Sequence, residues 1–322
     1  MTLRRKTIAI IGATHLGLIM LLYAVAQIIL LSGFAQLEDQ GIHEDIERAR
    51  STFADELARL EATTADYAHW DDTYAFVQDG NSAYIEANLS SETFANLGVN
   101  LAAFVNAQGE VVFARAFDLG SGEEAAIPPE IGAQLPADSP LLNAPDQRTG
   151  VSGILELADG PMLVAAYPIL TSQLGGPSAG SLIFGSFLND QKMQQFAASA
   201  HLTLAAFPYN NALLPGDVQQ ARSTLSVEAP AAIQTLDANT VAGYSLLTDV
   251  YGQPALILRT QASRHVYAQG QTSLSYLVLS LAAAGVITGG MMLLLLEKGV
   301  LSRVSQLSAS IRQMGDSTDL SL

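Results

Sequence analysis

The sequence predicts an α+β domain, with a long N-terminal helix and a mixed antiparallel sheet, flanked by two transmembrane helices. Three observations predict it. Segments 7–32 and 274–296 contain no charged residue, and each is long enough to cross a bilayer as a helix. A seven-residue apolar repeat follows the first segment and indicates a helix that extends beyond the membrane. After residue 99 the apolar period changes to two, which is typical of β-strands.

The basic residues predict how the chain crosses the membrane. They flank both spans: Arg4, Arg5 and Lys6 in segment 1–6, and Lys298, Arg303 and Arg312 after residue 296. Between the spans, residues 33–273 contain nine Lys or Arg and 28 Asp or Glu. Because basic flanks stay inside, we expect a two-pass protein of the plasma (inner) membrane with both termini cytoplasmic and residues 33–273 extracytoplasmic. A cleaved signal peptide is the alternative for the first span, but its apolar region is usually only about 7–15 residues long.

The composition limits the possible partners. The chain has a net charge of −16, and residues 33–273 alone carry −19, so nucleic acid is excluded as a partner. The lipid bilayer is an expected partner because of the two apolar segments. The chain has no cysteine and therefore no disulfide, but this does not decide its compartment.

The first extramembrane element is a helix expected over residues 36–77. Its apolar residues recur at seven-residue intervals: Ile46, Phe53, Leu60, Tyr67 and Tyr74. Such a seam either packs on the helix's own sheet or pairs with a second copy of the chain. The strict repeat over four heptads favours a paired stalk close to the membrane, and hence a homodimer.

The remaining elements follow in order. Ser91 is expected to cap a short helix that ends before Gly98. Period-two segments and turn residues predict hairpins at 101–106 with 110–117, 151–157 with 161–170, and 243–250 with 253–260, and single strands at 181–187 and 201–207. Helices are expected at 189–200 and 216–223, and residues 118–150 form a long loop that encloses a short helix. From residue 264 the chain turns helical and continues into the second span.

A second helical seam follows the second span. Apolar residues spaced four, three, four and three apart form it: Val300, Val304, Leu307, Ile311 and Met314. This a/d pattern predicts a helix that pairs with another copy of the chain and carries a signal inward.

Several motifs resemble the CHASE4 extracytoplasmic sensor domain over most of residues 33–273. They are Trp70-Asp71-Asp72, Tyr84-Ile85, Asn88-Leu89, the turn at 106–110, Gly252-Gln253-Pro254-Ala255, and Arg264. Residues 297–322 are similar to the first helix and the start of the connector of a HAMP linker, although the usual proline near the start and the second helix are missing. The resemblance implies a PAS-like or Cache-like outer domain in a bacterial or archaeal receptor. Such receptors continue into a histidine kinase, as in two-component systems, a cyclic-di-GMP enzyme or a chemotaxis module.

No catalytic residue, metal site or cofactor is expected. Gly176-Pro177-Ser178-Ala179-Gly180 matches the G-x-S-x-G nucleophile pattern, but a turn precedes the serine and a strand follows it, the reverse of what that mechanism needs. His69, Asp71 and Asp72 include carboxylate and imidazole ligands, but on a helix these positions point in different directions.

The candidate ligand-binding site is centred on Trp70, Asp71 and Asp72, where the only tryptophan of the chain lies between acids and aromatics. Polar or cationic groups on neighbouring elements that could complete a pocket for a small molecule are Tyr74, Tyr84, Arg115 and Tyr167. The alternative is a structural contact in which the aromatic ring and the acids fix the end of the helix on the sheet.

The expected function is therefore the sensor half of a transmembrane receptor, with no enzyme in this chain. A stimulus outside would shift the second span and the following helix between two packings. The alternative is a membrane-anchored binding or structural protein without signalling output. An outer-surface enzyme has the least support, because no catalytic constellation is found.

Overall fold

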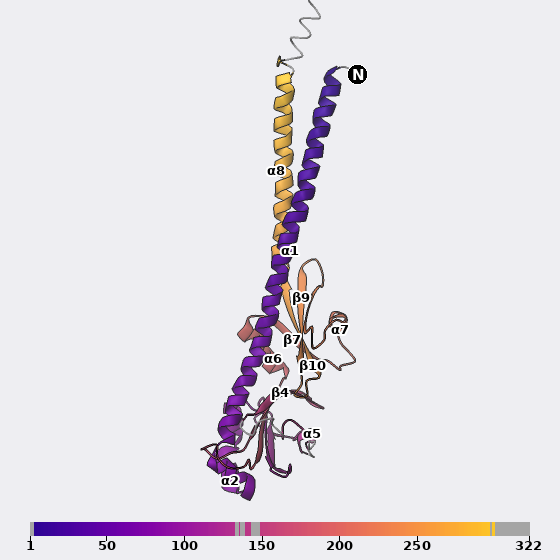
Figure 1. The fold of residues 1–322 in the computed structure, drawn as a ribbon. Helices are drawn as coiled ribbons and strands as arrows, with labels where there is room; N and C mark the ends of the chain where they lie inside the picture. The colour runs from indigo at the N-terminus through magenta and orange to yellow at the C-terminus, as the bar shows by residue number, and fades with distance from the viewer. Residues whose placement is uncertain (1–2, 133–134, 136–138, 143–148, 297, 300–322) are drawn as a thin grey trace, which may run out of the picture. The chain divides into compact units, whose positions relative to one another are not determined.

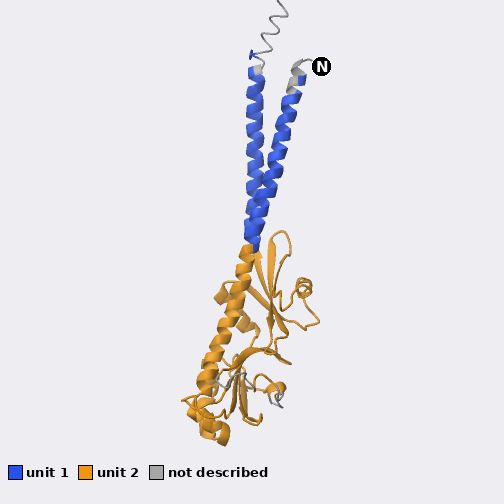
Figure 2. Cartoon of the chain, in the orientation of Figure 1, with its two compact units in different colours: residues 1–39, 264–322 blue, residues 40–263 orange. Residues whose placement is uncertain are grey.

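A computed structural model describes residues 3–132, 135, 139–142, 149–296 and 298–299. The chain divides into two compact units, residues 1–39 with 264–322 and residues 40–263 (Figure 2). The predicted seam Val300, Val304, Leu307, Ile311 and Met314 lies outside the described residues.

Residues 40–263 contain two antiparallel sheets where the sequence predicts one (Figure 1). The first has six strands in the order β3-β2-β1-β6-β5-β4: β1 Leu101–Asn106, β2 Val111–Phe117, β3 Glu124–Ala125, β4 Val151–Leu157, β5 Gly160–Pro168 and β6 Gly180–Phe187. The second has the order β7-β10-β9-β8: β7 Thr203–Pro208, β8 Ala231–Thr235, β9 Thr240–Thr248 and β10 Pro254–Ser263. A single parallel bridge between Ile154 and Asp249 joins them.

Eight helices are found in the described residues: α1 Leu3–Ala68, α2 Asp71–Asp79, α3 Ser82–Asn88, α4 Ser91–Leu97, α5 Pro129–Gly132, α6 Asp190–Ala200, α7 Gly216–Arg222 and α8 His265–Leu296. The helix expected to end at residue 77 ends at Ala68 and restarts at Asp71. Trp70 adopts an extended backbone between them (φ −88°, ψ 138°) and is the N-cap of α2. Asp71 and Asp72 then lie in the first turn of α2, where negative charge is favourable.

The heptad seam of α1 packs on the chain's own sheets. Ile46, Phe53 and Leu60 are at most 4% exposed within this single chain. Gly243 of β9 permits the contact, because a Cβ at that position would lie 2.7 Å from Ile46 Cγ1. The expectation that this seam pairs with a second copy is wrong, since its apolar side chains are already covered.

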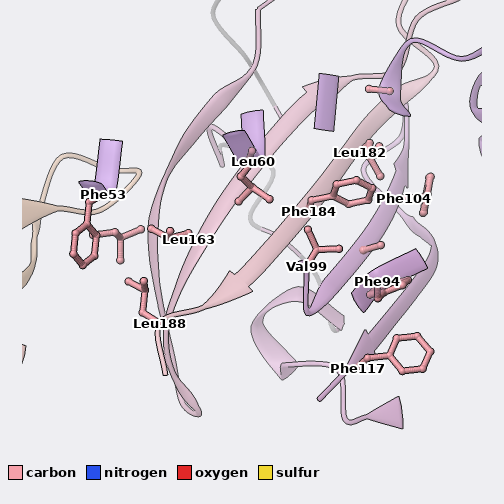
Figure 3. Close-up of a cluster of buried hydrophobic side chains, with 14 of the residues drawn as sticks. Phe53, Leu60, Phe94, Val99, Phe104, Phe117, Leu163, Leu182, Phe184 and Leu188 are labelled. Atoms are coloured by element: carbon pink, nitrogen blue, oxygen red, sulfur yellow. The ribbon is translucent and has the colours of Figure 1, made fainter. Parts of the chain in front are cut away.

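The main core lies between α1 to α4 and one face of the six-stranded sheet (Figure 3). Phe104 and Phe184 point from neighbouring strands into this cluster, together with Leu60 of α1 and Phe94 of α4. The opposite face of the sheet is covered by Ile131 and other apolar residues of segment 126–142. Both faces are thus buried, which explains why β1 is apolar at nearly every position.

The other unit is a pair of antiparallel helices formed by α8 and the first part of α1. Pairs of contacts follow the two helices in opposite directions: His15 with Thr288, Ile19 with Gly285, Phe34 with Gly270, and Glu38 with Arg264. Gly270 permits close approach, since a Cβ there would lie 2.3 Å from the Phe34 ring. Both helices are long and apolar enough to cross a membrane.

Candidate functional site

The break between α1 and α2 creates the centre of the predicted site. The Trp70 ring stacks on Tyr67 at a centroid distance of 4.2 Å, and Tyr67 meets Phe184 edge-on at 5.5 Å. This aromatic series connects the helix break to the centre of the six-stranded sheet. Trp70 is half-buried, so part of its surface remains open to solvent.

The loop after β5 is bound to the same helix break. The Leu170 N–H donates to the Ala68 carbonyl (3.1 Å), which caps the end of α1. Asp71 accepts a hydrogen bond from the Ser172 N–H (3.0 Å), and the Tyr74 hydroxyl donates to the Pro177 carbonyl (3.3 Å). We call Trp70, Asp71, Tyr74 and loop 169–179 the α1–α2 junction.

His69 and Tyr167 lie beside the junction with ring centroids 6.3 Å apart. Burial lowers the pKa of His69, and Asp66 only partly opposes this. Its Nε2 is buried and has no hydrogen-bond partner among the residues that the structure describes. Burial also raises the pKa of the Tyr167 hydroxyl, and the nearby carboxylate of Glu61 adds to the effect. Protonating His69 therefore costs free energy in the folded chain.

Two predicted residues, Tyr84 and Arg115, do not join the junction. Tyr84 is buried, shares a 2.6 Å hydrogen bond with Thr73, and stacks on Phe76 at 4.5 Å. Burial raises its pKa to about 12. Arg115 donates to Glu124 (3.1 Å) and to a main-chain carbonyl (3.0 Å), so both residues have structural partners. Asp72 is exposed at the start of α2.

No cluster of three or more His, Asp or Glu that could hold a metal ion is found in the described part of the chain. The Ser178 hydroxyl of the G-x-S-x-G match donates to the Gly180 carbonyl at 2.7 Å. A loop precedes this serine and β6 follows it, which is the order that the sequence indicates and the reverse of a nucleophile elbow.

A second feature of the domain was not found from the sequence. A cavity of about 410 Å³ lies between α1 and the region where β4, β5 and β9 approach one another. Arg50 and Glu47 line it together with apolar side chains. The signal in the sequence was a cation on the apolar face of α1, because Arg50 lies four residues after Ile46 and three before Phe53.

Comparison with known families decides the nature of this domain. Residues 52–206 match the profile of the CHASE4 domain. The match includes the six-stranded sheet, the junction and the residues of α1 that line the cavity from Phe53 onward. The sequence resemblance to CHASE4 is confirmed, and the remaining strands of the second sheet follow the matched segment.

The chain also resembles a known protein over nearly its whole length. The chain is 27% identical over 313 residues to the methanogenesis regulatory histidine kinase FilI of Methanothrix harundinacea (strain 6Ac). The match covers 97% of this chain and 34% of FilI, so the chain spans about a third of the length of that relative.

One solved structure reaches a TM-score that indicates the same fold, and a second is reported with it. A domain of a Vibrio parahaemolyticus protein assigned to the sensory box/GGDEF family matches with a TM-score of 0.50 at 14% identity, covering 74% of this chain and 99% of that domain. The extracellular domain of vpHK1S-Z8, assigned as a histidine kinase, gives a TM-score of 0.49 at 14% identity, covering 76% and 96%. The chain is thus a membrane protein, and its α+β sensor domain, which includes the CHASE4 match, is homologous to part of a histidine kinase.

Proposed function

We propose that the chain is the sensor half of a transmembrane receptor. In this proposal residues 33–273 detect a stimulus outside the cytoplasm, and residues 7–32 and 274–296 cross the membrane. Both termini are cytoplasmic, which the basic flanks support. The antiparallel pairing of α1 and α8 also supports termini on one side, because the two helices run in opposite directions.

The observation that carries this proposal is a CHASE4 domain placed in sequence between two helices that can cross a membrane. FilI aligns with nearly the whole chain, and its name states that it is a histidine kinase. We infer that this chain likewise passes its signal to a cytoplasmic output domain, a histidine kinase or a cyclic-di-GMP enzyme. Residues 297–322, as the first helix of a HAMP linker, would connect the second span to that output.

The second sheet is joined to the second membrane helix by a short stretch of chain. Only Arg264 separates the end of β10 from the start of α8 in the chain. A ligand that favours one of two sheet arrangements would therefore act on α8, by as much as its affinities for the two arrangements differ. We propose a homodimer through the membrane and HAMP helices, because the α1 seam is already used inside the domain.

A fusion experiment tests the proposal. Residues 1–322 are joined to the transmitter of a histidine kinase, and output is measured from a reporter gene. Gly270→Val, which would clash with Phe34 and alter the α1–α8 pair, should change the output, whereas Ser121→Ala on an exposed turn should not. Constant output for Gly270→Val and for substitutions at the junction would favour a membrane-anchored binding protein instead.

A further inference from the structure

The cavity between α1 and the sheets has the size and lining of a small-molecule site. Its volume of about 410 Å³ is within the usual range of about 300–1,000 Å³ for such sites. Phe53 and Leu57 of α1 form one wall, and Ile154, Leu163 and Leu247 form the other. Apolar walls with few polar groups favour a ligand with an apolar body.

Arg50 is the polar group that stands out in this lining. It is half-buried and lines the cavity. Six other Lys or Arg of residues 40–263 are described, and each binds a carboxylate or a main-chain carbonyl: Arg48, Arg59, Arg115, Lys192, Arg222 and Arg259. Among the described residues, the Arg50 guanidinium has no hydrogen bond or ion pair.

An unpaired cation at this place is unusual because the domain is so acidic. Residues 33–273 carry a net charge of −19, yet no carboxylate reaches Arg50 within ion-pair distance among the described residues. A guanidinium binds a carboxylate through two parallel N–H donors, which gives both strength and direction. Ser51 and Thr248 add hydroxyl groups to the same cavity.

We propose that this cavity binds a small soluble molecule that has an apolar body and one carboxylate. The carboxylate pairs with Arg50, and the apolar body lies between α1 and the strand residues Ile154, Leu163 and Leu247. The proposal deepens the proposed function, and only the signalling effect of the ligand rests on that function.

Glu47 sets the charge that the site accepts. It lines the cavity three residues before Arg50 and would repel a second negative charge on the ligand. The site is therefore selective for a monoanion. Glu47→Gln should tighten binding of a monocarboxylate, because it removes that repulsion.

The cavity lies where a bound ligand would contact α1 and both sheets. It contacts α1 on one side, and on the other it contacts strands of both sheets, near the bridge between Ile154 and Asp249. A ligand here would fix α1 against the place where the sheets meet.

Binding is measured with the full chain in phosphatidylcholine nanodiscs by titration calorimetry, with empty nanodiscs as the blank. The probes are 3-phenylpropionate and octanoate, and 3-phenylpropanol and octanol are their uncharged counterparts. We expect saturable binding of the acids and much weaker binding of the alcohols. Arg50→Gln should weaken binding of the acids about tenfold or more, since it removes a charge-assisted hydrogen bond.

Two further variants make the test specific. Arg48→Gln removes a neighbouring cation that does not line the cavity and should leave the dissociation constants unchanged. Ala54→Trp places a large ring in the cavity from an exposed position of α1 and should abolish binding without unfolding the domain. Equal binding by Arg50→Gln and the natural chain, equal binding of acids and alcohols, unchanged binding by Ala54→Trp, or no saturable binding of either acid would overturn the proposal.

The binding result and the signalling result can fail separately. Binding without any change in the output of the fusion protein would support the site and contradict the sensor function. A fusion whose output responds to junction variants, in a chain that binds neither acid, would support the sensor function and contradict the site.

Discussion

Substitution of Trp70 distinguishes the two roles predicted for the junction, a structural contact and a contact to a ligand. Trp70→Ala removes the stacking on Tyr67 and should lower the free energy of unfolding by about 1–3 kcal/mol if the ring holds the helix break on the sheet. Thermal unfolding followed by circular dichroism measures this. Trp70→Phe keeps most of the stacking and is the control. A Trp70→Ala chain of unchanged stability would instead favour a ligand contact.

Glu56 is a half-buried acid of α1 that binds two cations. It accepts hydrogen bonds from Arg59 on the same helix (2.7 Å) and pairs with Lys192 of α6 (2.5 Å). Burial acts to raise the pKa of Glu56, but the two cations outweigh it and the pKa is lowered. The carboxylate therefore stabilises the folded state in its charged form.

This pKa shift predicts an acid dependence of stability. Because the folded pKa lies below the ordinary value of 4.5, the contribution is complete above that pH and is lost as the pH falls through the folded pKa. Glu56→Gln should cost about 1–3 kcal/mol at pH 7 and reduce the slope of stability against pH in acid. Denaturant titrations at pH 3 to 7 measure both. An unchanged acid slope would show that Glu56 does not carry the effect.

Single residues were predictable where their partners are close in sequence. Asn189 caps α6 through a bond to Lys192 three residues later, and Gly98 adopts the left-handed conformation that ends α4. The cap of α4 itself is Ser90, one residue before the expected Ser91. Glu61, by contrast, accepts a hydrogen bond from Ser152, and no local pattern predicts a partner so far along the chain.

The helix α1 packs on β9 where Gly243 provides room. Gly243→Val should force Ile46 away from the strand and destabilise the domain by about 1–3 kcal/mol. Urea unfolding followed by the fluorescence of the single tryptophan, Trp70, measures the loss. Gly41→Ala on the same helix meets no atom within 4 Å and should stabilise the chain by about 0.5–1 kcal/mol. Equal effects of the two substitutions would contradict this packing.

The helices α1 and α8 are joined by a buried ion pair. Arg264 binds Glu38 through two nitrogens at 3.0 Å, and the Glu38 side chain is 8% exposed. Glu38→Gln should destabilise the pair by about 1–3 kcal/mol, because it removes the carboxylate that Arg264 binds through two charge-assisted hydrogen bonds. The reversed pair, Glu38→Arg with Arg264→Glu, should recover part of the loss.

An exposed ion pair on the same helix is the control for that measurement. Arg48 and Asp45 lie 3.2 Å apart, and the Arg48 side chain is 49% exposed. Asp45→Asn should therefore change stability by less than about 1 kcal/mol. If Glu38→Gln cost no more than Asp45→Asn in thermal unfolding, Glu38 and Arg264 would not hold the helices together.

Most helices and strands could be predicted from the turn residues and from the period at which apolar residues recur. The hairpins at 101–117 and 151–168 appear as predicted, because their turns and alternating residues are local signals. β8 was missed because it is a short edge strand, half-exposed and without a strong alternation. The seven-residue repeat of α1 was interpreted as a dimer contact. Apolar residues of a helix have the same spacing whether they pack on a sheet or on a second helix.

The whole molecule has an acidic segment, which includes the CHASE4 match at residues 52–206, between two stretches that can cross a membrane as helices. Its class was predictable because charge and long apolar segments are properties of composition. The division into two sheets was not, since it depends on which strands pair across loops of very different length. The cavity at Arg50 arises where α1 meets both sheets, so it too required the structure.

The most direct test of the account is the sidedness of the chain. The protein has no cysteine, so single cysteines can be introduced and labelled in intact cells with a membrane-impermeant maleimide. We predict that Ser121→Cys in the domain is labelled from outside, whereas Thr2→Cys and Ser302→Cys are labelled only after the cells are lysed. Labelling of Thr2→Cys or Ser302→Cys in intact cells, or protection of Ser121→Cys, would contradict a sensor domain held outside by two spans.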